Sequence, residues 1–239
     1  MTQTPDSQTA AAFSQLEYGS LGALVYQRLA QALMEGRLRP GDRLRIRELA
    51  ETMGVSVTPV RDAILRLVQD GALVMRSARD IRVYEVSTAE YLEIRDIRLE
   101  LEGMAAARAA QNATPEDIAR LEAMVQANED ALKTQDIRTA VGLNQRFHFE
   151  YCKIARMPTM LEILQRLWLK MGPLIAQIYA EGGRDMIDGH YPLMAAIRNK
   201  DPQAARIAMQ TDILSGGQPI LDYKLRQAET PPAATPPAA

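Results

Sequence analysis

The spacing of hydrophobic positions changes near residue 87 of this 239-residue chain. Before that point, a helical pattern over residues 24–33 is followed by turn signals, and residues 72–75 and 81–84 bracket a short turn that is typical of a β-hairpin. After it, every strong pattern is helical, and we expect helices over residues 88–111, 115–133, 136–156, 158–180, 186–200 and 202–214. The pattern therefore predicts a mainly α protein, with a small domain of three helices and a β-hairpin followed by an all-helical bundle of about six helices.

The two ends of the chain differ in composition from the region between them. The opening residues are small and polar, and the last residues form a Pro/Ala tail that cannot pack a core. We expect a flexible N-terminal arm, a first domain, a helical domain and a disordered tail, with the boundaries 1–17, 18–87, 88–227 and 228–239.

Composition and charge narrow the class of protein. No run of about eighteen apolar residues is present, so no membrane span is expected. The single cysteine, Cys152, and an N-terminus without the features of a signal peptide favour a cytoplasmic protein. The net charge of −2 is unevenly divided: residues 18–88 carry 11 Arg and 8 acidic residues (+3), whereas residues 89–239 carry 17 basic and 20 acidic residues (−3). A basic first domain is typical of a protein that binds nucleic acid.

The segment from Ile46 to Leu65 has the pattern of two helices that cross through a tight turn. Ala50 is small enough for a close approach, and Gly54 can take the positive φ that such a turn requires. Ser56 is placed to cap the second helix through its side chain, and Pro59 is tolerated in the first helical turn. These features predict a helix-turn-helix, although a two-helix corner in an unrelated helical protein would show the same small residues.

The second helix would present Val57, Thr58 and Arg61 at its outward N-terminal end, where recognition helices enter the major groove of DNA. Arg61 can bind a guanine edge or a phosphate, and Thr58 can contact a phosphate or a thymine methyl group. The hairpin that follows would form a wing, with Arg79 or Arg82 near the DNA backbone.

This region resembles the GntR family of bacterial regulators. The residues that carry the resemblance are Gly36–Leu44, Glu48-Leu49-Ala50, Gly54–Ala63 and Gly71–Val74. The resemblance implies that Ser56, Thr58 and Arg61 contact operator DNA, and that the arginine before Glu-Leu-Ala, here Arg47, does so too.

Two positions depart from that family pattern. Val57 stands where the family usually has arginine, which removes a donor for base edges, so we expect a different operator sequence. Asp80 follows Arg79 at the wing tip, where glycine is usual, and we expect its negative charge to weaken contact with phosphates.

The helical half is similar to the FadR-type effector domain, which is called FCD. The similarity covers residues 89–215 and includes the segment Ile97–Glu102 near its start. Asn144 and His148 are one helical turn apart on the same face of a predicted helix. The resemblance places Asn144, His148 and His190 on three positions of a divalent-metal site, and Asp212 on the fourth, where histidine is usual. Such a set suits zinc, nickel or manganese, whereas the alternative is that both histidines are hydrogen-bonded residues of a core or cavity.

A cavity with these residues and Arg98 would suit a small carboxylate effector. Arg98 also has a simpler interpretation, because a salt bridge to Glu102 on the helix surface is a common arrangement at this spacing.

We therefore predict that the chain is not an enzyme. We expect a homodimer that binds double-stranded operator DNA and responds to a carboxylate. A metal-dependent hydrolytic enzyme is the main alternative, but no general base or nucleophile pattern supports it, and Cys152 has the setting of a buried hydrophobic residue. A helical scaffold that binds only protein would leave the helix-turn-helix unexplained.

Overall fold

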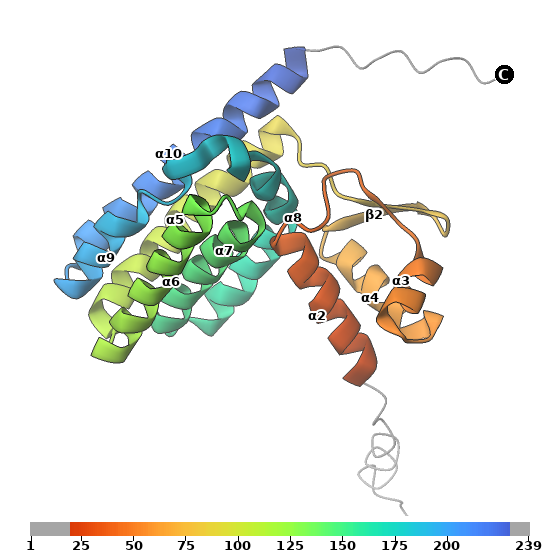
Figure 1. The fold of residues 1–239 in the computed structure, drawn as a ribbon, viewed down its shortest axis with the longest axis horizontal. Coiled ribbons are helices and arrows are strands. Elements are labelled where there is room, and N and C mark those ends of the chain that lie inside the picture. The colour runs from red at the N-terminus through yellow and green to blue at the C-terminus, as the bar shows by residue number, and fades with distance from the viewer. Residues whose placement is uncertain (1–19, 230–239) are drawn as a thin grey trace, which may run out of the picture.

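The computed structural model describes residues 20–229, which form a small head beside a larger helical bundle (Figure 1). The head contains α2 (Ser20–Met34), β1 (Arg43–Leu44), α3 (Ile46–Met53), α4 (Val57–Gln69), β2 (Leu73–Ser77) and β3 (Asp80–Val83). The predicted flexible arm and the last residues of the predicted tail lie outside the described residues. No helix within residues 20–229 is both long enough and apolar enough to span a membrane.

The helix-turn-helix prediction is confirmed. Gly54 ends α3 with φ of +66°, the conformation expected for the turn. Ala50 and the inward side chains of α4 are buried in the core of the head: Val60, Ala63, Ile64 and Leu67. Ser56 occupies the N-cap position of α4, but its side chain accepts no hydrogen bond from the helix, so that part of the prediction is wrong.

The wing is a three-stranded sheet rather than a hairpin alone. The strands lie in the order β1-β3-β2, and both pairs are antiparallel. The two-residue strand β1 was not predicted, since two residues carry no alternating pattern. It places Arg43 directly opposite Arg82 and Leu44 opposite Ile81.

The bundle consists of six α-helices in the described part of the chain, as predicted. They are α5 (Thr88–Asn112), α6 (Pro115–Lys133), α7 (Ile137–Ile154), α8 (Pro158–Gly182), α9 (His190–Arg198) and α10 (Pro202–Glu229), with a 3-10 turn, η1 (Gly183–Met186), before α9. Proline begins three of them, where its missing N–H costs nothing, and Thr114 and Asp117 form a capping box at the start of α6.

The last two helices differ from their predicted bounds. The helix expected from residue 186 begins at His190, because Met186 ends η1 and residues 187–189 form a turn. The helix expected to end at residue 214 continues to Glu229, through two glycines and Pro219. Tertiary contacts support this extension: the Tyr91 hydroxyl donates to the Gly217 carbonyl at 2.7 Å, and Ile220 is buried in the bundle core.

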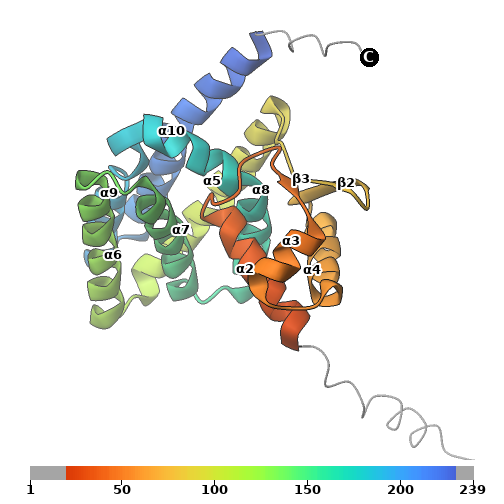
Figure 2. The ribbon, with the colours of Figure 1, turned by 45° about the vertical axis from the view of Figure 1, so that its right-hand side comes forward.

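Helix α8 joins the bundle to the head, and it lies against α2 in both ribbon views (Figures 1 and 2). Leu169 of α8 is buried in the core of the head. Gly172 packs so closely that a Cβ there would lie 2.6 Å from Cα of Met34. Gly36, with φ of +66°, has no room for a Cβ because Ala176 occupies that space. The two domains therefore meet through a backbone-to-backbone contact that leaves little room for sliding.

Candidate functional site

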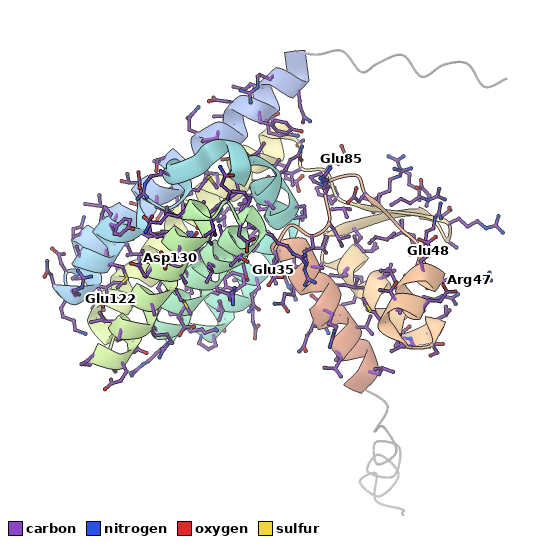
Figure 3. The ribbon with its side chains drawn as sticks, in the orientation of Figure 1. Glu35, Arg47, Glu48, Glu85, Glu122 and Asp130 are labelled. Carbon is purple, nitrogen blue, oxygen red and sulfur yellow. The ribbon has the colours of Figure 1, made fainter. Side chains whose placement is uncertain are left out.

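One candidate site is the outer face of the head. Val57, Thr58 and Arg61 are exposed at the N-terminal end of α4, as predicted. Figure 3 shows Arg47 and Glu48 at the end of α3 that is far from the bundle. A surface hollow lies between these helix ends and the wing, and its lining includes Arg43, Arg45, Arg47, Arg61 and Arg79. The structure thus brings together three of the predicted DNA-binding arginines, Arg47, Arg61 and Arg79, with two that sequence analysis missed.

Arg43 holds the tip of the wing. Its Nε and Nη2 atoms donate hydrogen bonds of 3.1 and 2.5 Å to the carbonyl oxygen of Arg79. On the other side of the turn, the backbone N–H groups of Arg79 and Asp80 donate to the hydroxyl oxygen of Ser77. The fork of a guanidinium can make such a paired contact, whereas an ammonium cannot. The tip is therefore held from both sides, which orients Arg79.

Asp80 does not stand alone at the wing tip. Its carboxylate forms an ion pair with Arg82, with an Nε–Oδ1 distance of 2.8 Å, and Arg82 also donates to the Gly41 carbonyl. Arg82 thus compensates the negative charge of Asp80 at the wing tip, and a weakened contact with phosphates stays a prediction. The pairing is local, because Asp80 and Arg82 are two residues apart on one strand, where their side chains lie on the same face.

The second candidate site is a buried polar cluster in the bundle. His148 from α7, His190 from the start of α9 and Asp212 from α10 each offer a ligand atom, and these atoms lie within 4.8 Å of one another. The Nε2 atom of His148 is 3.6 Å from Oδ2 of Asp212, and Nε2 of His190 is 3.9 Å from Oδ1. Asn144, one turn before His148, is also buried. The four residues proposed from the sequence therefore share one region of the bundle interior.

Glu102 orients His148, and sequence analysis missed this role. One carboxylate oxygen of Glu102 lies 2.7 Å from Nδ1 of His148 and accepts from the Tyr151 hydroxyl at 2.7 Å. The other accepts from Nε of Arg98 at 2.5 Å. Burial opposes ionisation of Glu102, but the charge of Arg98 and the contact with His148 lower the pKa of this carboxyl well below its usual value. The contact engages Nδ1, so Nε2 of His148 is left to face Asp212.

The salt bridge between Arg98 and Glu102 forms as the simpler interpretation expected, but it is not on the surface. Glu102 is fully buried and Arg98 is 7% exposed. The guanidinium of Arg98 also lies over the ring of Trp168, 4.7 Å from the ring centre. Arg98 therefore pairs with Glu102 and also lines the cavity of this site, and its contact with an effector stays a prediction.

Four buried polar atoms of the cluster have no hydrogen-bond partner among the described residues: Oδ1 of Asn144, Oδ1 of Asp212 and both ring nitrogens of His190. Burial and the neighbouring His148 lower the pKa of His190 far below its usual value, so its imidazole is neutral. Burial raises the pKa of Asp212 to about 6. Unpaired buried polar atoms are costly, and a neutral imidazole with carboxylate and amide oxygens is a donor set that divalent ions accept. These residues fit a divalent metal ion.

A cavity of about 40 Å³ reaches this cluster, with room for roughly three water-sized groups. Its polar lining comprises Tyr91, Arg95, Arg98, Asn144, His148, Trp168 and Asp212, and methionine and isoleucine side chains form much of the remainder. His190 is not among the lining residues, and it stacks instead on Phe147, with ring centres 4.1 Å apart. Of the four predicted effector residues, Arg98, Asn144 and His148 line the cavity and His190 does not.

Glycine at position 189 sets the position of Asp212. A Cβ on Gly189 would lie 2.8 Å from Cα of Asp212 and closer still to its carboxylate. The start of α9 can therefore approach α10 closely, which brings His190 and Asp212 together. Cys152 is fully buried, and burial raises its thiol pKa well above the usual value, so it does not offer a reactive thiolate.

Comparison with known proteins supports the division into head and bundle. Residues 21–83 match the family described as "Bacterial regulatory proteins, gntR family", and residues 93–214 match the FCD domain. The HTH-type transcriptional regulator McbR of Escherichia coli K12 is 35% identical over 195 residues, which cover 80% of this chain and 88% of McbR. The Uxu operon transcriptional regulator of the same organism is 24% identical and covers 90% of each chain.

Solved structures show the same fold. The structure of E. coli McbR/YncC matches with a TM-score of 0.80 and 33% identity, covering 87% of this chain and 99% of that one. A putative GntR regulator from Rhodococcus sp. RHA1 matches with a TM-score of 0.71 at 17% identity. The family and these relatives are transcriptional regulators and not enzymes. The chain belongs to the GntR family of bacterial transcriptional regulators, in its FadR-type branch, with a winged helix-turn-helix head and an FCD domain.

Proposed function

We propose that this regulator binds its operator as a homodimer and that a small carboxylate, bound in the bundle cavity at a divalent metal ion, changes its affinity for DNA. The observation that carries the proposal is the position of α8. One face of this helix lines the cavity through Trp168, Met171 and Ile175, and the next face packs on the head through Leu169, Gly172 and Ala176.

The hollow on the head would receive the DNA backbone beside the major groove. Its five arginines supply the positive charge, and Arg61 at the N-terminal end of α4 is placed to reach a base edge or a phosphate. Val57 would contribute an apolar contact, such as one with a thymine methyl group, and Ser56 and Thr58 would contact phosphates. In a twofold dimer, two such faces would read the two half-sites of a palindromic operator in the cytoplasm.

Asn144, His148, His190 and Asp212 would hold the metal ion through the atoms that lack protein partners, together with Nε2 of His148. Zinc, nickel or manganese bound there would supply a positive charge that attracts an anionic oxygen of the effector. Arg98, held by Glu102 and Trp168, would orient the carboxylate of that effector inside the cavity.

Effector binding can alter the head only if the cavity and the head share a rigid element with two arrangements. The face of α8 that lines the cavity cannot shift alone, because Gly172 and Ala176 on the neighbouring face contact the backbone of α2 and Gly36. A bound acid that pushes on Trp168 or Met171 would therefore shift the whole of α8. That shift would tilt α2, and the recognition helix with it.

Metal content, effector response and DNA binding can be tested on one preparation. We expect protein purified without a metal-chelating tag or chelator to carry close to one divalent ion per chain by mass spectrometry. The variant His148→Ala/His190→Ala should lose the ion and the effect of small acids on DNA affinity, while it retains DNA binding. A full acid response in that variant would exclude this cavity as the effector site.

Gly172→Ala tests the path from cavity to head. The added methyl group must push α8 from α2, so acids should still bind but shift operator affinity much less than in the wild type. Gly22→Ala is a matched control, since a Cβ there meets nothing within 4 Å. Acid binding by calorimetry and operator affinity by fluorescence anisotropy, with a duplex selected from random DNA, measure the two effects separately. An unchanged acid response in Gly172→Ala would contradict coupling through α8.

A further inference from the structure

A second contact between the bundle and the head lies at the C-terminal end of α4, distinct from the packing of α8 on the end of α2. Lys170 of α8 reaches the turn that follows α4, where a Cβ on Gly71 would lie 2.7 Å from Cε of Lys170. Gly71 has φ of +75°, and its backbone N–H donates to the Val68 carbonyl. The stem of the lysine therefore lies against the end of the recognition helix itself.

The ammonium group of Lys170 belongs to a partly buried polar group. It donates to Oε1 of Glu90 on α5 at 2.9 Å, and the Tyr84 hydroxyl donates to Oε2 of the same carboxylate at 2.6 Å. Nζ of Lys170 also lies 5.4 Å from the centre of the Tyr84 ring, within the range of a cation–π contact. Burial opposes ionisation of Glu90, but its hydrogen bonds with Tyr84 and Lys170 lower the pKa of this carboxyl. These three residues, which we call the interdomain latch, join α8, α5 and the segment that follows β3.

Two points of contact fix an angle that one point leaves free. The packing of Gly172 against Met34 prevents α8 from sliding along α2, but by itself it lets the head turn about that point. The interdomain latch holds the head at a second point, because the backbone N–H of Tyr84 donates to the carbonyl of Ala72, directly after Gly71. The recognition helix therefore cannot turn relative to the bundle unless the latch breaks.

We propose that the interdomain latch determines which spacing between half-sites the dimer accepts in its operator. This inference rests on the proposed function, because it requires two heads that bind two half-sites. In a twofold dimer, the angle of each head on its bundle sets the distance and the rotation between the two recognition helices. One inserted base pair moves a half-site by about 3.4 Å and turns it by about 35°, which heads held at a fixed angle cannot follow. Lys170, Glu90 and Tyr84 act as positioning residues, since none of the three lines the hollow on the head.

Operator duplexes with one base pair added or removed between the half-sites test the proposal by fluorescence anisotropy. The wild type should bind the selected duplex about tenfold or more tightly than either altered duplex, because both latches have to break before the altered half-sites are reached. Lys170→Met keeps the side chain as far as Cε but removes the ammonium, and Tyr84→Phe removes only the hydroxyl. In each variant the preference should fall to about threefold or less, with the salt dependence unchanged because no phosphate contact is lost. The control Lys153→Met breaks the lysine–glutamate pair with Glu150 on the bundle surface and should keep the full preference.

A further duplex, with one half-site scrambled, separates failure of the latch from failure of the dimer. If the wild type binds this duplex as tightly as the selected one, paired reading of two half-sites fails, and this inference fails with it. If the wild type needs both half-sites but tolerates every spacing, the dimer stands and the latch is overturned. A spacing preference that survives in both Lys170→Met and Tyr84→Phe, or that is lost equally in Lys153→Met, also overturns the latch.

A measurement without DNA tests the angle of the heads directly. Residue 51 is exposed on α3 and the native Cys152 is buried, so a nitroxide reagent labels Glu51→Cys selectively. Pulsed electron paramagnetic resonance on the labelled full chain should give one narrow distribution of distances between the two heads. Lys170→Met in the same background should broaden this distribution, and an equally narrow one would overturn the latch. Absence of any distance between labels would instead contradict the homodimer.

Discussion

The head and the bundle use arginine in opposite ways. In the head, Arg47, Arg61 and Arg79 surround a solvent-filled hollow, and Arg43 donates to a backbone carbonyl, which leaves its positive charge uncompensated. In the bundle, Arg98 is buried and its charge is balanced by the carboxylate of Glu102. Exposed charges cost little and attract a polyanion from a distance, whereas a buried charge requires a partner. This difference indicates that the head gains affinity for a polyanion from exposed charge. The bundle instead uses a neutralised charge to position a few buried polar atoms.

Removal of Glu102 should have the largest effect. Glu102→Gln leaves Arg98 buried without a counter-charge and weakens the support of His148, so we expect a loss of about 3–5 kcal/mol in the free energy of unfolding. Glu100→Gln is the matched control, because Glu100 pairs with Arg206 at the surface, and such pairs contribute about 0–1 kcal/mol. Urea unfolding, monitored by circular dichroism, measures the free energy of unfolding of both variants. Similar losses in the two would show that burial of the Arg98–Glu102 pair does not increase its contribution to stability.

Arg61→Ala should weaken operator binding by about 1–3 kcal/mol without changing the stability of the head, because Arg61 is exposed. The control Arg37→Ala removes an exposed arginine at the cleft between head and bundle, away from the hollow. Anisotropy titrations at several salt concentrations measure both variants. If Arg37→Ala proves as harmful as Arg61→Ala, DNA binding depends on overall charge rather than on this face.

The smallest effect is expected from Arg43→Lys, which keeps the charge but loses the paired contact with the Arg79 carbonyl. We expect operator affinity to fall by about 1 kcal/mol, with the same salt dependence, since the number of positive charges is unchanged. Arg45→Lys, in the same hollow, should have little effect, because Arg45 forms an exposed ion pair with Glu48, one helical turn away, which a lysine can keep. Wild-type affinity in Arg43→Lys would show that the wing tip does not need this contact.

Local sequence patterns predicted the elements of the fold well. Gly54 and the buried residues of α4 form the expected turn, and the prolines at residues 115, 158 and 202 begin helices as expected. The extension of α10 beyond residue 214 was not predictable in this way, because glycines and proline disfavour a helix locally. It is stabilised by Tyr91, which is 126 residues away in the chain.

The candidate site was predictable in its residue types but not in its contacts. Asn144 and His148 share a helix face by spacing alone, and the family resemblance supplied His190 and Asp212. Whether these side chains are buried, paired or left without a partner depends on how five helices pack around them. Glu102 and Trp168 had no local signal, because a glutamate at helical spacing from an arginine is usually on a surface and a lone tryptophan is usually core.

Periodicity, helix caps and turn residues are short-range properties, so the order of helices and the winged helix-turn-helix could be read along the chain. The charge state and hydrogen bonding of a buried group are set instead by neighbours from distant segments. Glu102 meets His148 across 46 residues, and Gly189 lets Asp212 approach from α10. Only the folded chain could therefore decide that Arg98 is held in the interior and that Trp168 has a donor without an acceptor among the described residues.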